Sequence, residues 1–168
     1  MSNLNSLYAR LGGEEGVIRL VKAYIEALKT LPGAQRLRSL YPEDLSKYEL
    51  RMTEFLSTWL GGPALYQERH GMPMLRESHR SFAIDGEARD EWMLCMRTAL
   101  RETVSDEELR LYLEGAFWRM ADSLRTKREK PPIRRLLSFG AVRIRSPSTA
   151  RARSAGPSPR SEANHDRR

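Results

Sequence analysis

The residue with the clearest chemical potential is His79, which follows a long irregular segment and precedes an amphipathic stretch that carries Trp92. Outside the basic C-terminal region the only other classical metal-binding side chains with nitrogen or sulfur are His70 and Cys95. Structural zinc sites and iron–sulfur clusters need several such ligands, so neither can be assembled from this chain. A cofactor that brings its own nitrogen ligands needs only one from the protein. His79 is therefore the candidate ligand of such a cofactor.

Haem meets this requirement, because the porphyrin binds iron in its plane and leaves an axial position for histidine. We expect the iron of a haem to be bound by His79. The residues Leu75, Phe82 and Ile84 flank it and are expected to form an apolar wall for the cofactor. Arg76 is expected to pair with an acidic group at the cofactor's edge. The other ring nitrogen of His79 needs a carbonyl acceptor, which would fix the tautomer.

Polar aromatic residues are the candidates for the opposite, distal face of the haem, because the helices expected over Glu14–Lys29 and Leu45–Leu60 contain no histidine. These residues are Tyr24, Tyr41, Tyr48 and Trp92. A buried hydroxyl or indole N–H group needs a hydrogen-bond partner, which is either a backbone carbonyl or a bound ligand. A donor aimed at a ligand with partial negative charge contributes about 1.5–3 kcal/mol. Two such donors would retain dioxygen strongly.

The charge is distributed unevenly along the 168 residues, whose net charge is +7. Residues 127–168 contain 12 Lys or Arg against 3 Asp or Glu, whereas residues 1–126 contain 17 against 19. Proline, serine and arginine dominate the C-terminal region, and apolar residues are scarce after Ile144. Such a composition cannot bury enough apolar surface to fold, so we expect residues 127–168 to form a disordered basic extension.

The extension could bind nucleic acid or an acidic membrane electrostatically. We favour a solvated tail with no specific nucleic acid and at most a weak electrostatic partner. The single cysteine excludes an internal disulfide and fits a reducing compartment. No signal segment or apolar span is visible, so we expect a soluble, cytoplasmic protein.

Hydrophobic residues recur at helical spacing along most of residues 1–126, which predicts one all-α domain. The expected helices are Glu14–Lys29, Ala34–Leu40, Leu45–Leu60, Gly86–Glu102 and a last helix from a capping box at Ser105 and Glu108 to Leu124. Between Ala64 and Ile84 the periodicity is broken by Gly71 and Pro73. We expect a long loop there with one short helix around Pro73–His79. Long loops inside compact domains are usually functional.

Several segments occur together in an order and spacing specific to one protein family. They are Tyr24, the corner 41–45, the run 55–63, Leu65 with Tyr66, the run 70–76, His79 with Phe82 and Ile84, and the run 89–96. Over roughly residues 5–126 the chain thereby resembles the group II truncated haemoglobins. The resemblance implies a two-over-two helical sandwich that encloses haem b, with His79 as the proximal ligand.

The resemblance also implies roles for the distal residues. Trp92 and Tyr24 correspond to hydrogen-bond donors for the ligand, and Tyr41 stands at the corner that faces it. Met52 and Phe55 would line the distal pocket, and Arg76 would meet a haem propionate. Tyr48 stands where the family commonly has a smaller residue, so it either turns toward the ligand or narrows its entry.

Other positions depart from the family pattern on both sides of the haem. Met52 replaces a more usual leucine. Ser78 and Ser81 stand where arginine and proline are common.

Three functions are compatible with these residues. The first is reversible binding of dioxygen and other diatomic ligands, for oxygen binding or transport rather than as a dedicated enzyme. The alternative is haem-dependent detoxification of nitric oxide, nitrite or peroxide, which needs a reductase as partner or a proton source. Phenol hydroxyls are too weakly acidic to supply protons well at neutral pH. A haem-free helical module with a nucleic-acid-binding tail is the third interpretation.

Overall fold

The computed structural model describes residues 6–127, which form helices and no strands. The long helices are α2 (Gly13–Thr30), α4 (Ser46–Trp59), α7 (Gly86–Thr103) and α8 (Glu107–Ser123). The shorter elements are α1 (Leu7–Leu11), the 3₁₀ turn η1 (Pro32–Ala34), α3 (Gln35–Arg38), α5 (Leu65–His70) and α6 (Leu75–His79). The predicted all-α class is confirmed.

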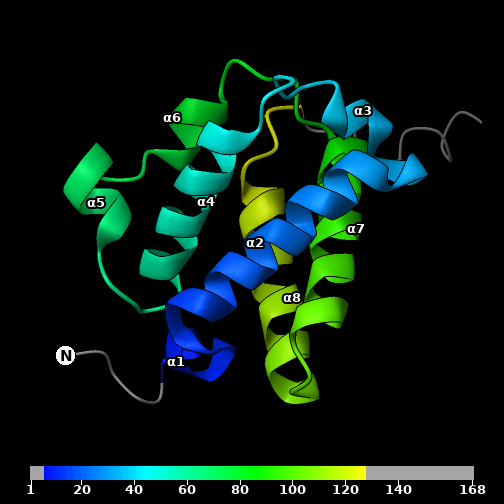
Figure 1. Cartoon of the computed structure of the whole chain (residues 1–168). Coiled ribbons are helices and arrows are strands. Elements are labelled where there is room, and N and C mark those ends of the chain that lie inside the picture. Colours follow the sequence, from blue (N-terminus) through cyan, green and yellow to red (C-terminus); the bar gives the residue numbers. More distant parts are fainter. Residues whose placement is uncertain (1–5, 128–168) are drawn as a thin grey trace, which may run out of the picture. The chain divides into compact units, whose positions relative to one another are not determined.

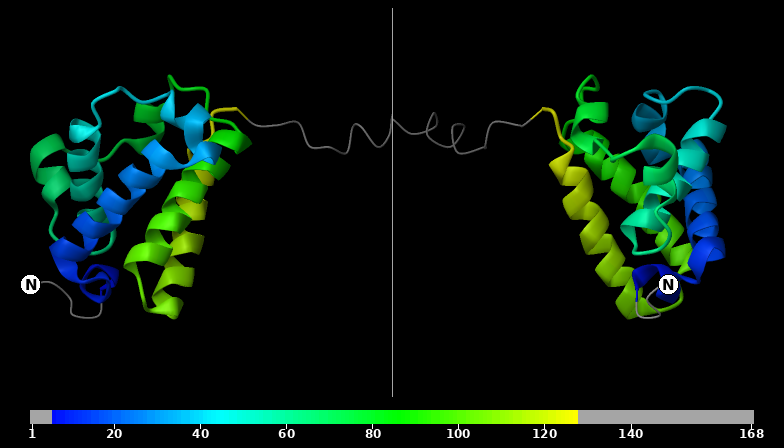
Figure 2. Two further views of the ribbon diagram at one scale, coloured as in Figure 1. Left: turned by 45° about the vertical axis from the view of Figure 1, so that its right-hand side comes forward. Right: turned by 90° about the vertical axis from the view of Figure 1, so that its left-hand side faces the viewer.

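Two pairs of long helices form the body of the molecule. α2 packs on α4 and crosses α7, and α7 lies alongside α8 (Figure 1). The two further views show the same arrangement of the long helices (Figure 2). This is the two-over-two arrangement that the family resemblance implies.

The apolar stripe of α2 forms the centre of the core, as its periodicity predicts. Its buried members are Val17, Leu20, Val21, Tyr24, Ile25 and Leu28. α1 meets the start of this helix closely, because Gly16 presents no side chain to it. A Cβ atom added at Gly16 would lie 2.0 Å from the carbonyl oxygen of Leu11. The glycine therefore permits α1 to fold back on α2.

Aspartate side chains cap the N-termini of the two C-terminal long helices, α7 and α8. Asp85 accepts a hydrogen bond from the Ala88 amide at the start of α7. Asp106 accepts from the Leu109 amide at the start of α8 and pairs with Arg10 of α1. The sequence predicts Ser105 as this cap, which is wrong by one residue. Both residue types cap helices well, and the ion pair with α1 adds a tertiary contact that favours Asp106.

The segment expected to be a loop from Ala64 to Ile84 contains two helices rather than one. The additional helix is α5, which packs on α4. Glu54 of α4 is 2% exposed and accepts hydrogen bonds from Arg69 at 2.5 Å and from His70 at 2.7 Å (Oε2–Nε2). Tyr66 of α5 places its ring edge-on to Phe55, with 6.0 Å between ring centroids. These tertiary contacts stabilise a turn of helix that is too short to form by itself.

Among residues 6–127, no helix is long and apolar enough to cross a membrane. The predicted division into a domain over 1–126 and a disordered basic extension over 127–168 stays a prediction, since residues 128–168 lie outside the described part.

We expect Glu54→Gln to lower the free energy of unfolding by about 1–3 kcal/mol at neutral pH, because two charge-assisted hydrogen bonds are weakened. Burial opposes the charge on Glu54, but hydrogen bonds from His70 and Arg69 outweigh it and lower the pKa of the carboxyl below 4.5. The difference in free energy of unfolding between wild type and Glu54→Gln should therefore be complete above pH 4.5. It should disappear as the pH falls through the lowered pKa of Glu54. Urea unfolding at several pH values tests this.

Glu15→Gln is the matched control, because Glu15 forms only an exposed ion pair with Arg19. Equal stabilities of Glu54→Gln and Glu15→Gln at neutral pH would show that the hydrogen bonds of the Glu54 carboxylate do not stabilise the fold.

Candidate functional site

A cavity of about 380 Å³ lies among α3, α4, α6, α7 and the end of α8. Its walls are mainly apolar and aromatic. The lining residues are Leu37, Leu40, Tyr41, Pro42, Tyr48, Arg51, Ser78, His79, Phe82, Ile84, Ala88, Arg89, Trp92, Ala121 and Leu124. Six of the residues singled out from the sequence are therefore brought to one space. Ligand sites typically combine such a wall with a few polar groups.

His79 reaches the cavity from the last position of α6. Its Nδ1 atom lies 2.6 Å from the carbonyl oxygen of Leu75, one helical turn earlier. A carbonyl oxygen only accepts hydrogen bonds, so Nδ1 carries the proton and Nε2 keeps its lone pair. The hydroxyl of Ser78 lies 3.2 Å from the same Nδ1 atom. The predicted carbonyl acceptor is confirmed, and the free Nε2 has the state that a metal ligand requires.

Tyr24 lies directly behind the cavity wall. It is fully buried on α2, and its hydroxyl has no hydrogen-bond partner among the described residues. Its ring centroid is 5.6 Å from that of Trp92 and 6.4 Å from that of Tyr48. Burial, and then the neighbouring phenols of Tyr41 and Tyr48, raise the pKa of Tyr24 well above 10. The hydroxyl is therefore a neutral donor near the Tyr41 phenol, and no hydrogen bond with good geometry satisfies it among the described residues.

Tyr41 and Tyr48 line the cavity together. The Tyr41 hydroxyl donates to the Tyr48 hydroxyl at 3.4 Å, and the two rings meet edge to face with centroids 4.8 Å apart. Burial, followed by the nearby Tyr48, raises the pKa of Tyr41 well above 10. Tyr41 therefore remains protonated at neutral pH and can only donate or accept hydrogen bonds there.

Trp92 belongs to the same aromatic group. Its ring lies between Tyr24 and Phe117, whose centroid is 6.0 Å away. Its indole N–H forms no hydrogen bond within residues 6–127, although the residue lines the cavity. The cavity therefore has an unpaired N–H donor in its wall and an unpaired O–H donor behind it.

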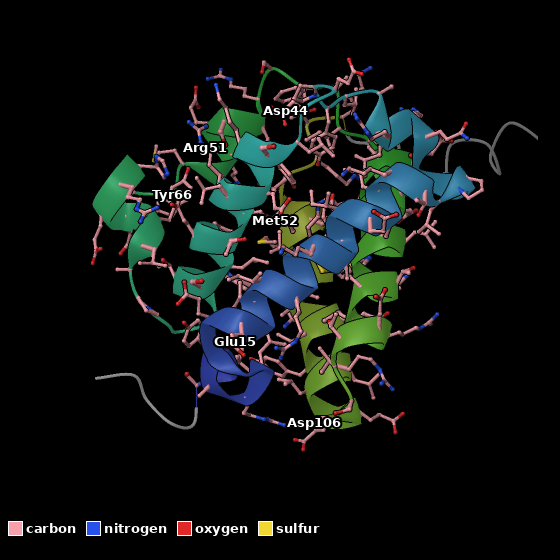
Figure 3. All side chains as sticks on the ribbon, in the orientation of Figure 1. Glu15, Asp44, Arg51, Met52, Tyr66 and Asp106 are labelled. Carbon is pink, nitrogen blue, oxygen red and sulfur yellow. The ribbon has the colours of Figure 1, made fainter. Side chains whose placement is uncertain are left out.

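The other predicted residues are divided between the cavity and its surroundings. Phe82 and Ile84 line it. Met52, Phe55 and Leu75 do not line it. Met52 is buried on the side of α4 that faces α2 (Figure 3), and Phe55 packs on Tyr66. Leu75 contributes its carbonyl oxygen, which accepts the hydrogen bond from His79.

Arg76 is exposed and does not line the cavity, whereas Arg51 and Arg89 do. Arg89 forms ion pairs with Asp122 and Asp90. The sequence contained a signal for both arginines: Arg51 follows Tyr48 by one helical turn, and Arg89 precedes Trp92 by one turn. Residues three apart on a helix share a face.

These residues fit haem. The set includes one imidazole with a free Nε2, apolar walls, and guanidinium groups suited to carboxylates. No group of three or more Asp, Glu, His or Cys side chains that could hold a bare metal ion occurs in the described residues. The second histidine, His70, is bound to Glu54 and lies outside the cavity. His79 is the protein ligand to which this chemistry points.

Comparison with known proteins supports a haem cofactor. The family model described as bacterial-like globin matches residues 6–126. The group 2 truncated hemoglobin YjbI of Bacillus subtilis is 36% identical over 113 residues, which cover 67% of this chain and 83% of that protein.

Solved structures are similar over the same part of the chain. The group II 2-on-2 hemoglobin of Agrobacterium tumefaciens is 39% identical, with a TM-score of 0.71 and coverage of 74% of this chain and 98% of the other. The truncated oxygen-avid haemoglobin of Bacillus subtilis is 34% identical, with a TM-score of 0.65 and coverage of 72% and 99%.

We expect Tyr24→Phe to stabilise the haem-free protein by about 1 kcal/mol, because it removes a buried hydroxyl that lacks a partner. Ser57→Ala is the comparison, since the buried Ser57 hydroxyl donates to the Thr53 carbonyl at 2.8 Å. That variant should lose about 1 kcal/mol. Urea unfolding of the haem-free proteins measures both changes. A destabilised Tyr24→Phe variant would show that the hydroxyl already has a partner inside the protein.

Proposed function

Because this chain belongs to the bacterial-like globin family and is a group II truncated haemoglobin with a haem cofactor, we propose that it binds dioxygen reversibly, with His79 as the proximal iron ligand. The observation that carries the proposal is the His79 ring, whose Nδ1 is bound to the Leu75 carbonyl while Nε2 is free at the cavity wall. When bound, haem would supply an iron able to bind a diatomic ligand, and His79 would hold that iron in the cavity.

His79 has two tasks in this proposal. Its Nε2 lone pair binds the cofactor, and its Nδ1–H, held by Leu75, keeps the ring from turning about its side-chain bonds. The same hydrogen bond increases the electron density at Nε2, which strengthens it as a ligand.

Two groups of this chain provide guanidinium partners for the carboxylates at the haem edge. We assign this task to Arg51 and Arg89, which line the cavity, in place of Arg76, which does not. Arg89 is held by Asp122, so it is already oriented. Arg51 is exposed and can adapt its position.

Tyr24 and Trp92 act on the distal ligand as hydrogen-bond donors. Each presents a donor without a partner among the described residues, so neither must break a bond inside the protein to reach a ligand. The Tyr41–Tyr48 pair lines the same space and limits the room for water. A ligand with developing negative charge is stabilised by about 1.5–3 kcal/mol for each charge-assisted hydrogen bond.

The protonation of the distal groups favours oxygen binding over peroxide chemistry. The pKa values of Tyr24 and Tyr41 are raised, mainly by burial, so neither phenol is a good proton donor to a reaction at neutral pH. Burial, and then Glu91, raise the pKa of the nearby Cys95 thiol to about 11, so it remains a neutral thiol. The described residues supply no imidazole on this side. The similar Bacillus subtilis structure, named oxygen-avid, supports the same choice.

Replacement of His79 by Ala should abolish stable retention of haem, because the only Nε2 at the cavity is removed. His70→Ala should retain haem, since His70 binds Glu54 instead. Visible spectra of the ferric, reduced and carbon-monoxide-exposed proteins measure both variants. An unchanged Soret band in His79→Ala would refute the ligand assignment.

Trp92→Phe should increase the rate of dioxygen dissociation about tenfold, because it removes one hydrogen bond to the ligand while keeping an aromatic wall. Trp59→Phe is the matched control. Trp59 stacks on Phe117 at 5.1 Å but does not line the cavity, so its replacement should leave the rate unchanged. Stopped-flow displacement of dioxygen measures the rates, and equal rates in the two variants would mean that Trp92 only packs.

A further inference from the structure

The segment that carries His79 has few contacts of its own with the helical body. α6 is a single turn of helix, and it packs along no other described helix. The cavity lies between it and the body, which explains the missing contact. The position of His79 therefore depends on what holds the two ends of its segment. α5 and Glu54 hold the N-terminal end.

The C-terminal end is held by the residues that follow α8. The Thr126 hydroxyl donates to the Phe82 carbonyl at 2.7 Å and accepts from the Ile84 amide at 2.9 Å. The amides of Thr126 and Lys127 both donate to the Ile84 carbonyl, at 3.0 and 2.9 Å. The Thr126 hydroxyl also lies 3.5 Å from the Ile84 carbonyl oxygen, so residues more than forty positions apart are joined by five hydrogen bonds.

These bonds continue to His79. The Phe82 amide donates to the His79 carbonyl at 3.1 Å, which closes a turn. The side chains of Phe82 and Ile84 line the cavity next to His79. Thr126 itself is exposed and lines no part of the cavity, so it can act on His79 only through this turn.

We propose that Thr126 is a positioning residue for the proximal histidine: its hydroxyl bridges Phe82 and Ile84 and thereby fixes the turn that sets the orientation of His79. The inference rests on the proposed role of His79 as the haem ligand. Lys127, the first residue assigned to the basic extension, takes part in the same contact, so the first residues after α8 act on the segment that carries His79.

The Thr126 hydroxyl can bridge Phe82 and Ile84 because a hydroxyl group donates one hydrogen bond and accepts another at the same time. Valine has the same shape and neither capacity, whereas serine keeps both. The two variants therefore separate the hydrogen bonds from the packing of the side chain.

The test uses the full-length haem-bound protein with Thr126→Val, Thr126→Ser and Thr98→Val. Thr98 is the control, because its hydroxyl bonds only to the Leu94 carbonyl of its own helix. Hydrogen exchange should show amides of the Phe82–Ile84 turn opening about two- to tenfold more often in Thr126→Val, the scale of one or two net hydrogen bonds. The iron–histidine stretching band of the reduced protein should shift or broaden, and haem should dissociate faster.

Thr126→Ser should restore all three properties, and Thr98→Val should match wild type. Unchanged exchange and an unchanged stretching band in Thr126→Val would overturn the proposal. Faster exchange with an unchanged iron–histidine band would also overturn it. In that case the Thr126 hydroxyl would stabilise the turn but would not orient His79. If His79→Ala loses haem while Thr126→Val behaves like wild type, only this inference is refuted. If His79→Ala retains haem, the proposed function is refuted.

Discussion

The hydrogen bond from His79 Nδ1 to the Leu75 carbonyl is the interaction on which the proposed chemistry depends. It fixes which nitrogen carries the proton and which faces the cavity, and it requires both residues to share one turn of helix. That turn is too short to be stable alone. The molecule must therefore support it from outside, through α5 at one end and through the residues after α8 at the other.

The distal side shows the opposite arrangement. α2 is long and buries one face in the core, and it holds the Tyr24 hydroxyl in a position where the described residues offer no hydrogen-bond partner. A buried hydroxyl without a partner lowers stability by about 1–3 kcal/mol. This unsatisfied hydroxyl belongs to a ring that lies beside the rings of Trp92 and Tyr48. A donor held in this way has no hydrogen bond to break before it meets a ligand, which is one contribution to electrostatic preorganisation.

Stability and function are thus divided between different parts of the chain. The four long helices bury the apolar residues and position Tyr24 and Trp92, the proposed distal donors. The segment between α4 and α7 carries His79, the proposed proximal ligand, and is held by polar contacts: the ion pairs of Glu54, the bond from Arg36 to Asp85 at 2.6 Å, and the Thr126 bridge. Polar contacts of this kind depend on pH and on solvent exposure far more than an apolar core does.

Local sequence determined a large part of this protein. Helical periodicity predicts the four long helices and the buried stripe of α2, and a chain with so few nitrogen and sulfur ligands leaves His79 as the single metal ligand to propose. Tertiary structure decided the rest. Nothing in the local pattern from Leu65 to His70 outweighs Gly71 and Pro73, so α5 depends on a buried carboxylate fifteen residues earlier. Arg76 lies three residues before His79 but does not line the cavity, whereas Arg51 and Arg89 do. Thr126 meets Phe82 across 44 residues. Periodicity reports only which face of an element is apolar, whereas these contacts depend on how the elements are placed, which the packing of the whole chain decides.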